Sequence, residues 1–551
     1  MSQDLPTPSF WSLFAEDGEP APEASPFWSL FTDAPPSAGP VAAAQGQTSP
    51  AALFFNEQLM FWALRNLPVE EAVKHLAIIG CIGSGKSTLI QLYLQSLAPR
   101  FRAERREPEQ LIIFDGKCEA LPQLAALDLN PEDERQNIYI LNPNDQRCAV
   151  WDLAEATRTP LMARYLASLL VPEERSNAPF FPDSARDLIF AVLLGLGVRG
   201  NPKWDFRDLI CALDSRERIR AITARHPRAK VIAERILSDE KHSFGVLSSL
   251  GTKIVRFEPV AALWNTARQA RRFTIEKFLA RPGVLVLGND PVLRDSVWPI
   301  NALLLKALTQ EILRRPDTRR PRHWFVLDEF PAMEKVDCIH DLLRRGRSKG
   351  AAVLLGTQGI EALNDIYGEN ATDDILSQCT YKTFLRAGGP KTAHWAERFF
   401  GNIRRTEASY SESWSKDGHS YSCQYHVVER ALFLASVFLD LPMPALGKPF
   451  LAVSDVPCLD ATLISRRWSD RIFSWCRRQS ADSPIAAVKP RNNVWEQTLE
   501  QWSEEEERIF LGQPQKSEPT AEEDTDSSAA DAGKDSKPYL PGLDRRREAD
   551  E

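Results

Sequence analysis

The chain has 551 residues and a net charge of −8, which divides into −7 on residues 1–64, +7 on 65–503 and −8 on 504–551. The longest apolar run has about 11 residues, whereas a membrane-spanning helix needs roughly 20, and the first basic residue is Arg65, so we expect neither a membrane span nor a signal peptide. The nine cysteines contain no Cys-x-x-Cys pair, which argues against a zinc site or disulfide framework and suits a cytoplasmic location. The basic middle weakly favours a polyanionic partner.

The first 50 residues are rich in Pro, Ala and Ser and lack apolar periodicity, which predicts a disordered tail. Within this tail the pentapeptide Phe-Trp-Ser-Leu-Phe occurs twice, at 10–14 and 27–31. In a helix, the first, fourth and fifth residues of each copy share one face. We expect this face to bind a partner protein, with avidity from two copies in each chain. The alternative is a local duplication that packs on the chain's own globular part.

The rest of the chain predicts an α/β fold. Residues 53–67 carry apolar side chains at mostly helical spacing and predict an amphipathic helix. Five apolar runs predict buried strands: KHLAIIG at 74–80, QLIIFDGK at 110–117, PGVLVLGND at 282–290, RHWFVLDEF at 322–330 and GAAVLLGTQ at 350–358. Residues 150–280 are mostly helical in pattern, so we expect a parallel sheet with a helical insertion. Beyond residue 480, Pro, Ser, Ala and acidic residues predict loss of order.

Residues 80–88 read GCIGSGKST and fit the phosphate-binding pattern Gly-x-x-x-x-Gly-Lys-[Ser/Thr]. Glycines allow backbone N–H groups to turn toward phosphate oxygens, and the following helix presents its N-terminus to the same anion. We expect Lys86 to reach the β- and γ-phosphates of ATP and the Ser87 hydroxyl to coordinate Mg²⁺. The predicted nucleotide-binding residues are Gly80, Gly83, Ser84, Gly85, Lys86, Ser87 and Thr88.

Polar residues also follow two of the later strands. Asp328 and Glu329 come directly after WFVL, at the sheet edge where open α/β sheets bind ligands. Asp328 suits the Mg²⁺ shell, and Glu329 is placed to polarise the attacking water as a general base. Gln358 ends the strand GAAVLLGT and could sense the γ-phosphate or orient water, a surface glutamine being the alternative.

Three arginines and a further strand end complete the predicted site. Arg344, Arg345 and Arg347 lie in LLRRGRSKG, and one of them could enter a neighbouring subunit's site as an arginine finger. The alternatives are a solvated basic helix end or a DNA-facing patch. Asp115 and Lys117 follow the strand QLIIF at the same ligand edge, with a less defined role.

With these motifs in place, the chain resembles a known family. The segment from 327 to 379, LDEFPAMEKVDCIHDLLRRGRSKGAAVLLGTQGIEALNDIYGENATDDILSQC, strongly resembles type IV secretion coupling proteins, which are conjugative DNA-pump ATPases of the FtsK–HerA superfamily. So do LNPNDQRCAVWDL at 141–153, FFPDSARDLIF at 180–190 and FTIEKFLARPGVLVLGNDP at 273–291. The resemblance covers roughly residues 65–460, and the combination of these segments in order is specific.

The resemblance implies a RecA-like P-loop domain at 51–149 and 276–460 with an all-α domain inserted at 150–275. A helical and then acidic, disordered tail would occupy 461–551. The family also implies hexameric rings around DNA that couple ATP hydrolysis to DNA movement toward a secretion channel, with non-specific DNA contacts and with relaxase or channel components as partners.

Carried over residue by residue, the family's nucleotide motifs fall on Lys86, Ser87, Asp328, Glu329 and Gln358, and Arg347 best matches the trans arginine. Typical members begin with two transmembrane helices, and this sequence contains none. We therefore expect a cytoplasmic ATP hydrolase that a partner of the repeated pentapeptides recruits to the inner membrane. Two other functions stay open: an ATPase that couples protein cargo to a secretion system, and an assembly module switched by nucleotide.

Overall fold

The computed structural model describes residues 58–63, 65–172, 180–198, 203–266, 272–288, 290–415, 418–444, 449–456, 459–467, 485–491 and 498–512. The N-terminal tail with both pentapeptides and the acidic tail after 512 lie outside these residues. Among the described helices, none combines the length and apolarity that crossing a bilayer requires.

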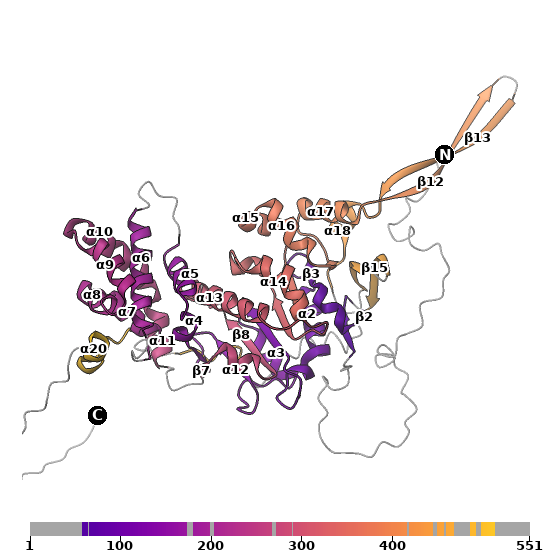
Figure 1. Cartoon of the computed structure of the whole chain (residues 1–551). Coiled ribbons are helices and arrows are strands. Elements are labelled where there is room, and N and C mark those ends of the chain that lie inside the picture. The colour runs from indigo at the N-terminus through magenta and orange to yellow at the C-terminus, as the bar shows by residue number, and fades with distance from the viewer. Residues whose placement is uncertain are drawn as a thin grey trace, which may run out of the picture.

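A nine-stranded sheet forms the centre of the larger lobe (Figure 1). Its strands run in the order β15-β14-β11-β3-β10-β9-β4-β8-β5. Seven of them are parallel, and β14 and β15 add an antiparallel edge. The bounds are β3 Leu76–Ile79, β4 Gln110–Asp115, β5 Ile138–Leu141, β8 Gly283–Gly288, β9 His323–Leu327, β10 Ala351–Thr357, β11 Tyr381–Phe384, β14 Pro449–Val456 and β15 Leu459–Arg467. The five predicted strands are therefore confirmed as β3, β4, β8, β9 and β10.

Both faces of this sheet are covered by helices, which explains why its strands are continuous apolar runs. Alternate side chains of one strand enter different cores: Leu76 and Ile78 pack with α2, whereas Ala77 and Ile79 join the core of α13. The helices of this lobe are α2 Lys86–Leu97, α3 Ala120–Ala126, α12 Ile275–Leu279, α13 Arg294–Leu313, α14 Ile339–Arg345, α15 Ile360–Tyr367, α16 Glu369–Ser377, α17 Pro390–Phe400 and α18 Ala435–Asp440.

The helix predicted at 53–67 is wrong for the residues that the structure describes. They form a hairpin, β1 Leu59–Trp62 and β2 Arg65–Pro68, which precedes the 3₁₀ turn η3 Val69–Lys74. Periodicity cannot distinguish a short apolar run in a strand from one in a helix. Tertiary packing decides here, because Trp62 is buried edge-on against Tyr93 of α2 and Ala63 adopts a positive φ of 46° at the turn.

A second, all-helical lobe lies between β5 and β8 in the chain (Figure 1). The two-residue strands β6 Val150–Trp151 and β7 Arg272–Phe273 pair in parallel where the chain leaves and rejoins the sheet. The boundaries of 150 and 275 stay a prediction, but helices do occupy this part of the chain as expected. They are α4 Leu153–Ala156, α5 Pro160–Leu170, α6 Phe180–Leu196, α7 Phe206–Leu213, α8 Arg216–Thr223, α9 Pro227–Leu237, α10 Glu240–Ile254 and α11 Glu258–Thr266.

Residues 498–512 correct the expectation that the chain loses order beyond residue 480. They end in helix α20 Glu504–Leu511 and pack on the helical lobe. The Arg207 side chain is only 3% exposed and donates to Glu506 and to the carbonyl of Glu500. Trp502 is buried and donates from its indole nitrogen to Asp208 over 2.9 Å. Average composition hides such a contact, because a single tryptophan and an ion pair to a buried arginine suffice to order a short segment.

One further element was not predicted. Strands β12 Asn402–Ser415 and β13 Gly418–Ala431 pair along their whole length and project from the larger lobe (Figure 1). Their sequence is rich in serine and lacks the apolar runs that predicted the other strands, and an exposed ribbon has no core to impose such runs.

A buried histidine makes the sheet sensitive to acid. The His75 ring nitrogen Nε2 lies 2.8 Å from the Leu343 carbonyl, and the Val353 N–H donates to Nδ1. Because Nδ1 accepts, the ring is neutral, and burial lowers the pKa of His75 to about 4. An unfolded histidine titrates near 6.5, so this stabilisation is fully present above pH 6.5 and is lost as the pH falls toward 4.

We therefore expect His75→Asn to flatten the pH dependence of stability, since Asn keeps an acceptor and tolerates the positive φ at this position. The wild-type free energy of unfolding should fall by up to about 3 kcal/mol more than that of the variant between pH 7 and 4. Urea unfolding at several pH values measures this, with the exposed His242→Asn as the control. An unchanged slope in His75→Asn would contradict the assignment.

Candidate functional site

The site lies where the carboxyl ends of three adjacent parallel strands meet. β10 pairs with β3 on one side and with β9 on the other. The loop at 80–85 follows β3, Asp328 and Glu329 follow β9, and Gln358 follows β10. Parallel pairing thus brings together residues that are more than 200 positions apart in the sequence.

The loop after β3 has the backbone of a phosphate cradle. Gly83 and Gly85 adopt positive φ values of 75° and 100°, which side-chain-bearing residues rarely tolerate, and α2 begins directly after Gly85. A Cβ on Gly80 would lie 2.6 Å from the Leu385 Cβ, so this position also excludes a side chain. Together with Ser87, Thr88 and Gln358, the loop lines an open pocket of about 420 Å³.

Lys86 is held at the base of this loop. Its side chain is buried, and Nζ donates to the carbonyls of Gly80 and Cys81 over 2.6 and 3.2 Å. Burial lowers the pKa of Lys86, while the charges of Glu329 and Asp328 act in the opposite direction. The first turn of α2 therefore holds a cation close to two carboxylates. A negatively charged ligand bound beside Lys86 would further favour the charged form of the lysine.

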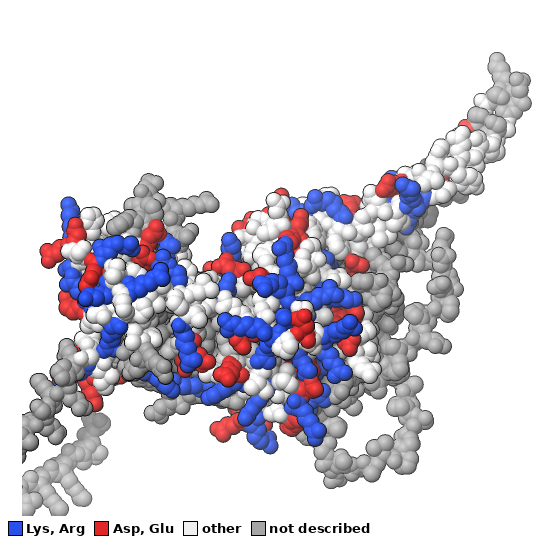
Figure 2. All heavy atoms as spheres, in the orientation of Figure 1, with Lys and Arg blue, Asp and Glu red and all other residues white. Residues whose placement is uncertain are grey.

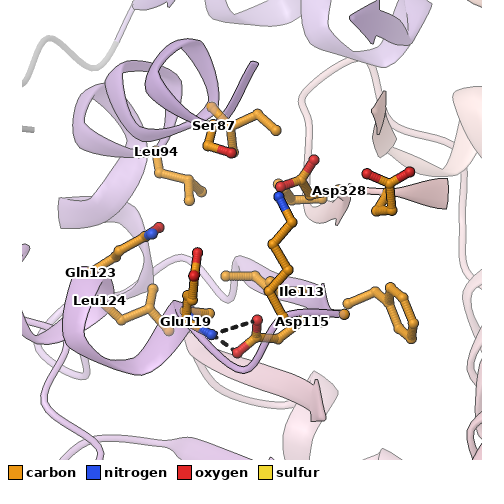
Figure 3. Close-up of a pocket in the computed structure, with 15 residues that line it drawn as sticks. Ser87, Leu94, Ile113, Asp115, Glu119, Gln123, Leu124 and Asp328 are labelled. Carbon is orange, nitrogen blue, oxygen red and sulfur yellow. Dashed lines mark hydrogen bonds between the residues drawn. The ribbon is translucent and has the colours of Figure 1, made fainter. Parts of the chain in front are cut away.

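Asp328 carries the best metal-binding oxygen of the site. Its carboxylate is mostly buried, and Oδ1 has no hydrogen-bond partner among the described residues. Burial raises the pKa of Asp328, partly offset by Lys117 and Lys86. Ser87 and Asp328 line the same pocket (Figure 3). A hydroxyl and a carboxylate oxygen are ligands that Mg²⁺ accepts, and an orphaned buried oxygen is what a cation would satisfy. The residues present therefore fit Mg²⁺.

Gly356 and Glu329 determine the local backbone geometry beside the Asp328 carboxylate. A Cβ on Gly356 would lie 2.9 Å from Asp328 Oδ1, so only glycine allows β10 to approach the carboxylate. Glu329 has left-handed backbone angles of φ 58° and ψ 50°, a conformation that costs roughly 1–3 kcal/mol for such residues. Gln358 Nε2 donates to Glu329 Oε2 over 2.7 Å. The predicted general base and the predicted strand-end amide are thus in direct contact.

The two residues after β4 have separate roles. Asp115 accepts hydrogen bonds from the backbone N–H groups of Glu119 and Ala120, both at 2.9 Å (Figure 3). It therefore fixes the start of α3 rather than facing a ligand. Lys117 lines the pocket beside the phosphate loop, and its charge lowers the pKa of Asp328. Its position at a strand end was the only sequence signal for this second lysine.

The arginines lie away from this edge. Arg347 is exposed on the 3₁₀ turn η7 Gly346–Lys349, which precedes β10, whereas Gln358 follows it. Seven strand residues separate the two, or about 23 Å. Arg344 pairs with Asp374 at 2.5 Å, and Arg345 lies 3.8 Å from Asp341. The structure therefore does not bring Arg347 to the site of its own chain.

Comparison with known proteins finds the family that the sequence motifs resemble. The family model described as the type IV secretion-system coupling protein DNA-binding domain matches residues 62–460. Coupling protein TraD of Escherichia coli strain K12 is 25% identical over 362 residues, which are 64% of this chain and 47% of TraD. The chain thus spans about half the length of this relative.

Solved structures resemble the chain in fold. The bacterial conjugative coupling protein TrwBdeltaN70, in its unbound form, superposes with a TM-score of 0.58 at 18% identity, covering 80% of this chain and 93% of that one. Plasmid coupling protein TrwB in complex with ADP and Mg²⁺ gives 0.55 at 18% identity, over 76% and 93%. The predicted RecA-like P-loop fold with an additional all-α domain is confirmed.

Because a neutral amide avoids the cost of burying a charge, we expect Asp328→Asn to leave the ligand-free protein as stable as wild type, or about 1 kcal/mol more stable. Asp115→Asn is the matched control: its carboxylate is also buried but accepts two backbone hydrogen bonds, and losing one of them should destabilise by about 1 kcal/mol. Chemical unfolding without nucleotide measures both. An equal loss of stability in the two variants would contradict the metal-binding assignment of Asp328.

Proposed function

The chain belongs to the type IV secretion-system coupling protein family, and from that premise we propose that it is an ATP hydrolase that moves DNA toward a secretion or conjugation apparatus. One observation carries the hydrolase part: the charge of Lys86 is coupled to Asp328 and Glu329, and Gln358 donates to Glu329, so these residues gather at one edge of the sheet. The family supplies the DNA part. Since TraD is matched over only part of its length, the activity of the whole protein is part of the proposal.

Each residue has a role that its position supports. Backbone N–H groups of the phosphate loop, from Gly80 to Thr88, hold the phosphates of ATP, and Lys86 leaves its carbonyl acceptors to pair with the β- and γ-phosphates. Ser87 and Asp328 hold Mg²⁺. When bound, Mg²⁺ neutralises charge on the phosphates. Glu329 takes the proton of the attacking water, and Gln358 keeps its carboxylate oriented.

The family further suggests a hexameric ring around DNA, in which Arg347 reaches the site of the next subunit. Its exposed position away from its own site is compatible with that role. Non-specific contacts of Lys and Arg with phosphates would carry DNA binding, and such side chains lie on both lobes, interleaved with acidic ones (Figure 2). Relaxase or secretion-channel components would be further partners. A cytoplasmic position with recruitment to the inner membrane belongs to the same proposal.

The sequence allows two binding surfaces for the repeated pentapeptides: a partner protein, or the chain's own globular part. Two rival functions remain as well. Protein-cargo coupling is favoured if hydrolysis ignores DNA but responds to a cargo protein. A nucleotide-switched assembly module is favoured if Glu329→Gln leaves both assembly and activity unchanged.

We expect ATP hydrolysis by the purified chain to rise with single- or double-stranded DNA and to fall again at high salt, because counterion release drives phosphate contacts. Glu329→Gln should reduce the rate roughly 10²–10⁴-fold through loss of the base, and Lys86→Ala serves as the blank. Steady-state phosphate release measures all of them. Hydrolysis indifferent to DNA would overturn the DNA motor, whereas hydrolysis absent from the wild type would overturn the enzyme.

A mixing experiment tests Arg347. Arg347→Ala and Lys86→Ala should each abolish hydrolysis, since a missing finger costs roughly 10³-fold or more. In an equal mixture of the two variants, each interface needs the phosphate loop of an Arg347→Ala subunit and the arginine of a Lys86→Ala neighbour. Random assembly gives this combination at about a quarter of the interfaces, so the rate should recover to roughly a quarter of wild type. Arg344→Ala and Arg345→Ala are the controls. No recovery on mixing would exclude a role in trans.

A further inference from the structure

The projecting hairpin has two faces of different chemistry. Opposed residues of an antiparallel pair point to the same side, so the pairs Ala408–Tyr425, Tyr410–Cys423, Glu412–Tyr421 and Trp414–His419 share one face. We call this the aromatic face. The opposite face carries Ser409 and Gln424, then Ser411 and Ser422. The sequence thus places every aromatic ring of the two strands, apart from His426, on one side.

The aromatic face is uncovered in the described chain. Tyr410, Trp414, Tyr421 and Tyr425 are 80, 78, 77 and 72% exposed. At the outer end, the His419 ring contacts the rings of Trp414 and Tyr421, at centroid distances of 3.7 and 4.5 Å. A two-stranded ribbon is only marginally stable in water and needs a third strand or a helix on its apolar face, and a grouped apolar surface marks a binding site.

The charges of the hairpin indicate what covers this face. On the aromatic face Glu412 contacts His419, and the Glu407–Arg430 pair lies on the opposite face, so the aromatic part offers no excess of cations. A nucleic-acid strand stacked on aromatic rings would also require a positively charged groove along its backbone. An uncharged aromatic peptide fits better, because tyrosine and tryptophan supply large, rigid contact area at low conformational-entropy cost, as they do in antibody paratopes.

The chain itself contains such peptides. We propose that the Phe-Trp-Ser-Leu-Phe segments at 10–14 and 27–31 bind the aromatic face of the hairpin in the same chain. Both are uncharged, and in a helix each would present two phenylalanines and a leucine on one side. Acidic residues follow them at Glu16, Asp17 and Asp33, opposite in charge to the exposed Arg404 at the base of the aromatic face.

The length of the tail permits this contact and favours the same chain. The second segment ends 27 positions before Gln58, the first described residue, and an extended chain of that length spans up to about 90 Å. The hairpin is about 48 Å long, from 14 residues in each strand. Tethering within one chain raises the effective concentration of the segments at the hairpin, so weak aromatic contacts suffice within one molecule.

Cys423 reports whether the face is covered, because its thiol lies on it, opposite Tyr410, and is exposed in the described chain. We expect the variant with serine at Phe10, Phe14, Phe27 and Phe31 to let iodoacetamide alkylate Cys423 roughly fivefold faster than in wild type, as loss of a weak contact would. Ser12→Ala with Ser29→Ala, which spares the apolar side of each segment, is the matched control. Peptide mass spectrometry measures the rates without nucleotide or DNA, so the result is independent of the proposed hydrolase. Equal rates in wild type and the phenylalanine variant would overturn the proposal.

The reciprocal change tests the hairpin. Serine at Tyr410, Trp414, Tyr421 and Tyr425 should speed amide hydrogen exchange in residues 9–31, whereas alanine at Ser409, Ser411 and Ser422 on the opposite face should not. Unaltered exchange elsewhere in the chain shows that the larger lobe still folds. Exchange in 9–31 that is already fast in wild type, or that stays slow in the aromatic-face variant, would overturn the proposal.

Isotope mixing separates the same chain from a neighbouring copy. With p-benzoylphenylalanine at position 28 and an equal mixture of light and ¹⁵N-labelled chains, cross-links to 402–431 should join only peptides of one isotope. Cross-links between light and heavy peptides would overturn the assignment to the same chain. Cross-links to other proteins in place of the hairpin would overturn the proposal in favour of partner recruitment.

Discussion

The parallel pairing of β10 with β3 and β9 is the constraint on which the site depends. It sets the phosphate loop, the Asp328–Glu329 pair and Gln358 side by side, although each belongs to a different part of the chain. A shift of one residue in this register would turn every side chain to the other face. The apolar side chains of both cores prevent such a shift, so the packing of the sheet also fixes the geometry of the site.

This edge concentrates groups that work against stability. Asp328 has a buried oxygen without a hydrogen-bond partner among the described residues, Lys86 is buried, and Glu329 has a strained backbone. Strain of this kind persists where the surrounding structure determines it. Here the buried strands on either side and the glycine at 356, which leaves room for the Asp328 carboxylate, impose the conformation. The same features equip the edge to bind a cation and an anion together.

The elements outside the central sheet differ from it, because only a few specific contacts hold each of them. Residues 498–512 are ordered on the helical lobe by Trp502 and by the Arg207–Glu506 pair. The β12–β13 hairpin, in contrast, extends its aromatic face away from the described core. Residues 498–512 thus pack on a surface of the described chain, whereas the aromatic face of the hairpin is not covered by any described residues.

The parallel strands, the phosphate loop and the carboxylates after WFVL could be predicted from local patterns, because buried strands and glycine loops require particular residues at fixed local spacing. Three other features became visible in the folded chain alone: residues 59–68 form a hairpin, Asp115 fixes a helix start while Lys117 acts on Asp328, and Gln358 contacts Glu329. Each depends on a partner distant in the chain. Local spacing constrains the backbone of a segment, whereas its contacts follow from what the folded sheet places beside it.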